Sequence, residues 1–258
     1  MPARAGRRAR RPAPLRVVDI ERDIISEFFL DRDLTGRLPD ERIALMLSPS
    51  DAETPDSHIE LRARIAANLA LFERRAVDQP EARRAAVSVV LAPLEGGTGF
   101  VFTQRAYSLR RGAGQYALPG GNLEPGETAL DAGLRELHEE LAIDLPPGAA
   151  LGLLDDFVTR GGHVVTPIVL WSAAALVLVP AADEVHAAWL RPIAELDHPD
   201  SPRWQPGEAG GAEILQMRIR DKWVNPPTAA LLYQFREVAL HGRPTRVDQV
   251  GQPAWTAR

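Results

Sequence analysis

The sequence of 258 residues contains no cysteine. Disulfide bonds, zinc sites built on thiolates and cysteine nucleophiles are therefore excluded. The lack of cysteine is compatible with a reducing cytosol, and we expect a cytoplasmic protein. The sequence also lacks an apolar run of about 18 residues, the length that a membrane-spanning helix needs. Its most apolar stretch, residues 164–180, is interrupted by Pro167 and Ser172, so we expect no membrane partner.

Lysine is almost absent, because Lys222 is its one occurrence and arginine supplies the other basic residues. This usage indicates codon composition rather than function. The net charge of -5 and the isoelectric point near 5.7 argue against broad binding of nucleic acid. An apolar content of 45% and a charged content of 25% are ordinary for a soluble globular protein. The length allows one large domain, or one domain with an appendage.

Residues 120–143 carry the most informative pattern in the chain. Their first half is turn sequence, since glycine and proline recur from Pro119 to Gly126 and block regular structure. Their second half predicts a helix, for which Thr128 is a suitable N-cap, and Asp131 three residues later completes a capping-box pattern. One apolar face follows from leucines at helical spacing, which are Leu130, Leu134, Leu137 and Leu141.

A different face of this helix is acidic, with Glu136, Glu139 and Glu140 at positions i, i+3 and i+4. Like charges at this spacing destabilise an exposed helix by about 0.2–0.5 kcal/mol per pair. One interpretation is a solvated face that Arg135, four residues before Glu139, partly relieves. The other is an oxygen cage for a hard divalent cation, because Mg²⁺ takes carboxylates, water and substrate phosphates as ligands. The glycine-rich turn and Glu127 before the helix favour the cation.

The same stretch resembles the Nudix box, which reads glycine, five residues, glutamate, seven residues, and then Arg-Glu-aliphatic-x-Glu-Glu-x-Gly-aliphatic. The corresponding positions in this chain are Gly121, Glu127, Arg135, Glu136, Leu137, Glu139, Glu140, Ala142 and Ile143. All of them match except Ala142, which stands where the family has glycine. Because glycine suits left-handed dihedral angles and alanine is strained there, we expect the turn after the helix to be built differently.

The resemblance implies a Nudix hydrolase, which cleaves a diphosphate linked to a further moiety. It implies an α/β fold, a Nudix-type α/β/α sandwich around a mixed β-sheet. It also implies Mg²⁺ or Mn²⁺ as a cofactor, with ligands from Glu136, Glu139, Glu140 and the backbone carbonyl of Gly121. Such a cation neutralises the charge of the diphosphate and helps to orient an attacking water.

The general base for this water is left open. Glu136 is the first candidate, and Glu140 shares its face of the helix. An acid from a later loop is the alternative, because the acidic loop at residues 182–186 precedes the last predicted strand of the domain. Glu184 and, after it, Asp183 are the candidates in that loop, where both would also suit a solvated surface.

Four further residues lie near these candidates. The family pattern implies that Glu127 and Arg135 pair and brace the loop against the helix. His138 lies on neither the acidic face nor the leucine face, so we expect a surface residue rather than a metal ligand. His163 follows two glycines in a predicted turn, where a turn residue is the first interpretation and a substrate contact the second.

The residues before the box resemble the segment that marks coenzyme A diphosphatases within this family. The positions that fit are Thr103, Arg105, Leu109, Arg110, Gly114 and Pro119 to Gly121. Three positions differ, where serine, histidine and phenylalanine of that segment are replaced by Ala106, Gly112 and Leu118. Residues 165–169 resemble a later strand of those enzymes, whereas the loop at residues 123–127 has the general Nudix length rather than their longer, aspartate-rich one.

Arginine forms bidentate, charge-assisted contacts with phosphate, and Arg105, Arg110 and Arg111 precede the glycine-rich turn. We therefore expect them to bind substrate phosphates, although arginine is this chain's default base and each also suits a solvated position. Coenzyme A or its thioesters are the first substrate expected. ADP-ribose, other nucleotide sugars and nucleoside triphosphates are the alternatives.

An alternative from another class is a Nudix-fold sensor that binds a nucleotide without cleaving it. The sequence disfavours it, because the box keeps all of its carboxylates. We expect a small-molecule nucleotide diphosphate as the partner, with no nucleic acid, and a homodimer is left open.

The chain is predicted to fall into four segments. Residues 1–14 are rich in Arg, Ala and Pro and form a disordered basic leader, with an organelle-targeting peptide as the alternative. Residues 15–79 form an N-terminal helical appendage, residues 80–240 the hydrolase domain, and residues 241–258 an irregular tail.

Periodicity and turn residues predict the elements of these segments. Helices are expected over residues 18–30, 59–75 and 228–240. Strands are expected over residues 85–93, 100–105, 151–160, 163–170, 174–179 and 187–190, with a hairpin over 213–224 and a surface loop over 199–211.

Overall fold

The computed structural model describes residues 58–257. The predicted basic leader, the predicted helix at residues 18–30 and most of the predicted appendage lie outside the described residues. Among the described residues, no helix is long and apolar enough to cross a bilayer.

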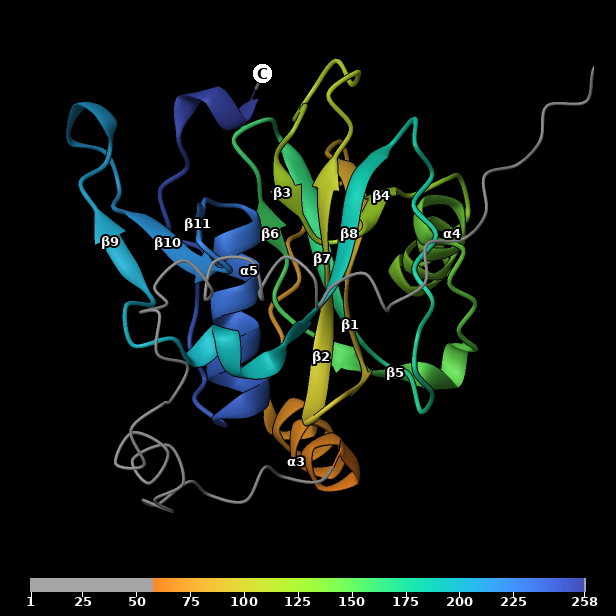
Figure 1. Cartoon of the computed structure of the whole chain (residues 1–258). Helices are drawn as coiled ribbons and strands as arrows, with labels where there is room; N and C mark the ends of the chain where they lie inside the picture. Colours follow the sequence, from red (N-terminus) through yellow and green to blue (C-terminus); the bar gives the residue numbers. More distant parts are fainter. Residues whose placement is uncertain (1–57, 258) are drawn as a thin grey trace, which may run out of the picture. The chain divides into compact units, whose positions relative to one another are not determined.

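Within residues 58–257, eight strands form one mixed sheet. Its centre is β1 (Arg83–Leu94), which pairs in parallel with β7 (His163–Trp171) and antiparallel with β2 (Gly97–Arg105) (Figure 1). The outer strands are β3 (Tyr116–Ala117), β4 (Gly120–Asn122), β5 (Ala150–Leu153), β6 (Phe157–Val158) and β8 (Val185–Pro192). The parallel pair within an otherwise antiparallel sheet confirms the expected mixed sheet.

Both faces of this sheet are apolar, because successive side chains of a strand point to opposite faces. On one face, Val90, Val101 and Ile168 pack against helix α4 (Ala129–Leu141). On the other face, the sheet packs in one core with helices α3 (His58–Leu71) and α5 (Thr228–Phe235). Figure 1 shows α4 on one side of the sheet and α5 on the other. The layers are those of the expected α/β/α sandwich.

Residues 116–122 insert between β1 and β2, and we call this segment the wedge. β7 covers one edge of β1, and β8 covers one edge of β2. The facing edges of β1 and β2 pair in register from Leu91–Phe100 to Leu94–Gly97, near the turn that joins them. Further from that turn, β3 pairs with β2 and β4 pairs with β1. The segment therefore enters along β2, reverses, and leaves along β1, which holds Gly120 and Gly121 inside the sheet.

Helix α4 begins with the predicted capping box. The Thr128 side chain accepts from the Asp131 amide, and the Asp131 carboxylate accepts from the Thr128 amide. Leu137 and Leu141 are fully buried against the sheet. A helix whose N-terminal amides are satisfied and whose apolar face is buried gives its other side chains fixed positions.

The turn after α4 contradicts the expectation that Ala142 would require a different structure. Ala142 adopts the left-handed conformation, with φ 54° and ψ 36°. Its amide donates to the carbonyl of His138, and the amide of Ile143 donates to that of Leu137. The turn is thus the left-handed cap that glycine adopts elsewhere, because these hydrogen bonds and the burial of Ile143 (3% exposed) hold the alanine in it.

A second, three-stranded sheet lies among the described residues beyond the main one. It consists of β9 (Arg203–Gln205), β10 (Ile214–Ile219) and β11 (Lys222–Val224). The predicted hairpin at residues 213–224 is confirmed, whereas β9 falls in a segment expected to be loop. The predicted helix at residues 228–240 consists of α5 followed by a π-helical segment at Arg236–Leu240. Short 3-10 helices occupy Pro147–Ala149, Ile193–Asp197, Glu208–Gly210 and Ala254–Ala257.

Helix α3 belongs to the same core as α5. Its buried residues Leu61, Ile65 and Leu69 join the cluster that contains Phe235 and Val238. The helix is shorter than the predicted 59–75, because the chain after Leu71 turns away. The predicted domain boundaries remain a proposal.

Two buried aspartates between β5 and β6 bind residues from segments before β1 and after α5. Asp155 accepts from Arg246 at 2.7 and 2.8 Å and from the amide of Arg75. Asp156 accepts from Arg74 and from the hydroxyl of Thr166. The sequence predicted a continuous strand at residues 151–160, and this is wrong, because the chain bends here to bury both carboxylates.

The strand predicted at residues 174–179 is also wrong. The segment is irregular. The amide of Val179 donates to the carbonyl of Leu141 at the end of α4, and Leu176 and Leu178 pack in the core beneath that helix. The alternating apolar residues of this segment, which resemble a strand in sequence, therefore pack against the end of a helix instead.

Candidate metal and active site

Three carboxylates converge at the end of the sheet. Glu136 and Glu140 project from α4, and Glu184 precedes β8. One oxygen atom from each lies within 4.8 Å of the other two. Glu136 and Glu140 are buried, with 9% and 4% exposed, whereas Glu184 is exposed. Three acidic oxygens this close form a site of high negative charge.

Backbone hydrogen bonds bring Glu184 to the helix. The carbonyl of Glu140 accepts from the amide of Ala181 at 2.8 Å, and the carbonyl of Ala181 accepts from the amide of Glu184 at 3.0 Å. The carbonyl of Glu184 accepts from Ala106 at the end of β2 at 2.8 Å. The acidic loop is thus held between α4 and the residue after β2, and Glu184 is the acid of this loop that joins the cluster.

The two glycines of the wedge are shaped to the carboxylates. The amide of Gly120 donates to Oε2 of Glu140 at 3.0 Å. A Cβ atom on Gly120 would lie 2.1 Å from the carbonyl oxygen of Ala86, and one on Gly121 would lie 2.2 Å from Oε1 of Glu136. Gly120 admits no side chain because the atoms it would meet are backbone, whereas a side chain on Gly121 would displace the carboxylate of Glu136.

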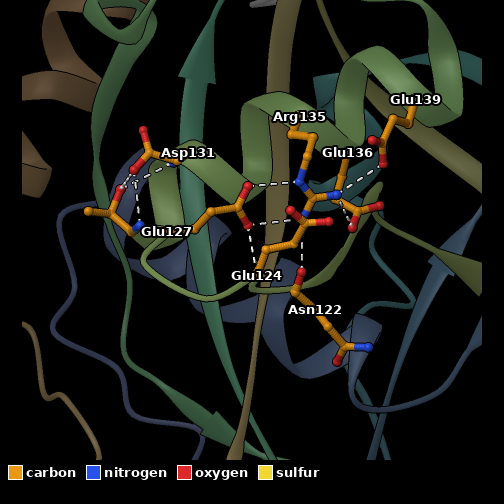
Figure 2. Close-up of polar contacts among 8 residues, drawn as sticks. Asn122, Glu124, Glu127, Asp131, Arg135, Glu136 and Glu139 are labelled. Atoms are coloured by element: carbon orange, nitrogen blue, oxygen red, sulfur yellow. Dashed lines mark hydrogen bonds and ion pairs between the residues drawn. The ribbon is translucent and has the colours of Figure 1, made fainter.

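Arg135 links the loop to the acidic face, as Figure 2 shows. Its Nε and Nη2 donate to the two carboxylate oxygens of Glu127 at 2.8 and 3.0 Å, and Nη2 also donates to the carbonyl of Asn122. Its Nη1 donates to Glu136 at 2.9 Å and to Glu139 at 3.0 Å. The predicted pairing of Glu127 with Arg135 is present, and one guanidinium orients two box glutamates.

The electrostatics of the cluster favour a cation. Burial raises the pKa of Glu140 to about 7, against the hydrogen bond from Gly120 that lowers it. Burial also raises the pKa of Glu136, and the hydrogen bond from Arg135 opposes this. The neighbouring groups thus supply too little positive charge to offset the burial of the two carboxylates. An all-oxygen set of this kind fits a hard divalent cation. Glu136, Glu140 and Glu184 are the residues placed to hold it.

The remaining predicted ligands lie at the margin. Glu139 is half exposed and directed to Arg135, and it is not in the group of three converging oxygens. The α-carbon of Gly121 faces the carboxylate of Glu136, because a Cβ atom there would lie 2.2 Å from Oε1. Asp183 is exposed outside the group. His138 is exposed and contacts Asp144 at 2.8 Å, as expected of a surface residue.

Of the predicted phosphate-binding arginines, Arg105 is the last residue of β2, and Arg110 and Arg111 lie in the loop between β2 and β3. Arg105 is half-buried, and its positive charge acts on Glu140. Arg110 and Arg111 are exposed. Within the described part of the chain, these three arginines have no carboxylate within ion-pair distance. They are therefore available to an anionic ligand, and Arg105 is the one whose charge reaches the carboxylate cluster. His163 lies at the start of β7, where its amide donates to Thr159.

The chain matches the family model for a NUDIX domain over residues 82–209. It is 34% identical over 127 residues to Nudix hydrolase 3 of Caenorhabditis elegans, covering 47% of this chain and 53% of that protein. It is 39% identical over 103 residues to the Nudix hydrolase NudL of Escherichia coli K12, covering 39% of this chain and 53% of that protein. The chain thus spans about half the length of the curated relatives it matches.

Among solved structures, the chain is similar to a MutT/nudix family protein from Enterococcus faecalis. The two share 17% identity with a TM-score of 0.40, over 58% of this chain and 52% of that one.

Proposed function

The chain belongs to the Nudix hydrolase family through its domain at residues 82–209, and we propose that it is a divalent-metal-dependent hydrolase. Its reaction is cleavage of the diphosphate in a nucleoside diphosphate linked to another moiety. The observation that carries this proposal is the convergence of Glu136, Glu140 and Glu184 within 4.8 Å. A solvated acidic face would spread its charges apart, whereas this fold concentrates and buries them.

Bound Mg²⁺ or Mn²⁺ supplies neutralisation of the diphosphate and a lowered pKa for an attacking water. Glu136 and Glu140 would hold the cation from α4 and Glu184 from the facing loop, and Glu139 and the Gly121 carbonyl would complete the proposed ligand set. Arg135 fixes the orientation of Glu136 and Glu139. A water attacks phosphorus in line as the bridging phosphate oxygen leaves, and one clustered carboxylate takes the water's proton.

The three carboxylates differ in their suitability as that base. Glu136 is held by Arg135, which favours its ionised form, and Glu140 accepts the amide of Gly120. Glu184 is exposed and its side chain has no hydrogen bond with a described residue, so it can move toward the water. We retain Glu136, Glu140 and Glu184 as the catalytic set, which single Gln substitutions separate.

The substrate that we propose first is coenzyme A or one of its thioesters. Support comes from Arg105, Arg110 and Arg111, because a 3′-phosphate in addition to a diphosphate rewards several arginines. ADP-ribose and related nucleoside diphosphate derivatives are the second candidate, supported by the general Nudix length of the loop after Gly121. A non-catalytic sensor is disfavoured by the complete and convergent carboxylate set.

A substrate panel with Mg²⁺ and with Mn²⁺ tests the proposal. Release of 3′,5′-ADP and 4′-phosphopantetheine supports coenzyme A, and cleavage of ADP-ribose without action on coenzyme A rejects it. Glu136→Gln should abolish turnover with little loss of nucleotide binding. A protein that binds nucleotides but shows no metal-dependent turnover of any panel member would be a sensor.

A further inference from the structure

A hollow of about 130 Å³ lies beside the wedge. Its walls include Gln115 and Tyr116 from the entrance of the wedge, Trp223, Asn225 and Thr228 between β11 and α5, and Trp255 from the C-terminal tail. We propose that this hollow binds the purine ring of the substrate's nucleoside. The inference rests on the proposed function, because it adds the base site to the diphosphate site.

The size and walls of the hollow suit one flat ring. Sites that enclose a whole drug-sized ligand measure about 300–1,000 Å³, so this hollow is too small for a complete dinucleotide. Trp223 is braced by the guanidinium of Arg203, 3.8 Å from its ring centroid. Trp255 has 46% of its surface exposed. Nucleobases stack on aromatic side chains of this kind.

A chain of hydrogen bonds presents a polar donor to this ring. Gln216 accepts from Arg203 at 2.6 and 3.0 Å and donates to Oδ1 of Asn225 at 2.8 Å. The amide nitrogen of Asn225 makes no hydrogen bond with any described residue. Because Oδ1 is occupied, Asn225 is oriented as a donor, and purine ring nitrogens are acceptors.

Gln115 connects the hollow to the arginines. A Cβ atom on Gly112 would lie 3.3 Å from Nε of Arg105 and 3.5 Å from Oε1 of Gln115. Both side chains therefore surround the same point of the loop. Arg105 in turn acts on Glu140 through its charge. Gln115 of the hollow thus neighbours Arg105, and Arg105 is near enough to Glu140 for its charge to lower the pKa of that carboxyl.

The hollow is also within reach of the diphosphate site along the backbone. Gly121 lies five positions after Tyr116, a stretch of chain that can span at most about 18 Å. The segment reverses between β3 and β4, so the two positions are closer than that limit. A nucleotide can place its base in the hollow and its phosphates at Arg105 and the carboxylates.

Most of this base site lies outside the matched NUDIX domain. Trp223, Asn225 and Trp255 all follow residue 209, where the match ends. Recognition of the base is therefore separate from the box that performs the reaction.

Kinetics with Mg²⁺ and either coenzyme A or ADP-ribose test the proposal. Trp223→Leu and Trp255→Leu should each raise KM about tenfold to a hundredfold, the loss expected for one stacking contact, with kcat unchanged within about twofold. Trp204→Leu is the matched control, because Trp204 is a partly exposed tryptophan that packs on Tyr233 away from the hollow, and its KM should stay at the wild-type value. Unchanged KM in both hollow variants overturns the proposal and leaves the hydrolase function standing.

A binding measurement distinguishes failure of the proposed base site from failure of the proposed hydrolase function. In the presence of EDTA, ADP should quench the tryptophan fluorescence of the wild type and of Trp204→Leu. Trp255→Leu should lose affinity for ADP. Ribose 5-phosphate, which lacks the purine ring, should not quench the fluorescence of the wild type. Trp255 lies in the tail, so its replacement leaves the fold intact, and thermal unfolding verifies this. Absence of turnover together with ADP bound at the hollow rejects the hydrolase alone. Equal ADP affinity in Trp255→Leu and the wild type rejects the hollow as the base site.

Discussion

The backbone amide of Gly120 donates to Oε2 of Glu140 across 3.0 Å. This hydrogen bond joins the wedge in the sheet to the acidic face of α4, and it places a main-chain donor where two buried carboxylates would otherwise repel each other. The geometry of the site thus depends on the glycine pair as closely as on the glutamates.

Gly121→Ala should displace Glu136, because the new Cβ atom would lie 2.2 Å from its Oε1. A shift of about 1 Å at a reacting centre costs on the order of a hundredfold in rate, so we expect kcat to fall by about that factor. Steady-state kinetics with the substrate identified by the panel measure the loss. Gly148→Ala is the control, since its Cβ would meet nothing within 4 Å. Equal activity of both variants would contradict the inferred packing.

Arg135→Lys should weaken the site although the charge is kept. The guanidinium makes contacts with Glu127, Asn122, Glu136 and Glu139 at once, and a lysine ammonium cannot reproduce this fork. Loss of such an orienting partner reduces metal affinity or activity about 10–100-fold. Titration of activity with Mg²⁺ measures the effect, and Arg62→Lys on the exposed side of α3 should behave as wild type. A variant with unaltered Mg²⁺ dependence would show that Arg135 has no orienting role.

Stability of the metal-free protein should decrease as pH rises from about 4.5 to 7. Burial raises the pKa of Glu140 from 4.5 to about 7 in the folded state, so in this window the folded chain binds more protons than the unfolded chain. The free energy of unfolding therefore falls with pH, by up to about 3 kcal/mol for this group. Urea denaturation in EDTA measures the slope.

Two controls accompany this pH series. Glu140→Gln should flatten the slope, because the titrating group is gone. Excess Mg²⁺ should raise the free energy of unfolding more at pH 7.5 than at pH 5, since the cation binds the ionised carboxylates. A pH profile that rises through the same window would exclude burial as the dominant influence on Glu140.

Ala142→Gly should stabilise the protein by about 1 kcal/mol. The left-handed conformation is unfavourable for alanine and not for glycine, and Ala142 is exposed, so its methyl group contributes little packing. The free energy of unfolding from urea titration checks this, with turnover expected to be unchanged. Ala63→Gly, at an exposed position inside α3, should instead destabilise by about 1 kcal/mol. Destabilisation by both variants would mean that the turn imposes no strain on Ala142.

Local patterns predicted the elements whose signals are local. The capping box and leucine spacing defined α4, and the acidic face of that helix carries Glu136 and Glu140 as expected. Glu184 was found because an acidic loop before a strand is visible in sequence, but its nearness to α4 depends on backbone bonds from Ala181. Such long-range contacts explain why Glu139 and Asp183 could not be separated from the converging set beforehand.

Other features had no periodic signal at all. β3 and β4 contain two and three residues, too few for an alternating pattern, so the sequence predicts a turn and no strand in the wedge. Asp155 and Asp156 lay inside an otherwise strand-like stretch, and nothing in the sequence revealed their arginine partners. The prediction for the turn at Ala142 is wrong because hydrogen bonds supplied by the folded structure override the intrinsic preference of alanine.

The buried pair of aspartates also constrains how the molecule is made. Asp155 receives the side chain of Arg246, and Asp156 receives that of Arg74, from segments on opposite sides of the NUDIX domain in sequence. An uncompensated buried carboxylate is strongly destabilising. During synthesis, Asp155 therefore emerges before Arg246, and its carboxylate gains this arginine only after the segment beyond the NUDIX domain has followed.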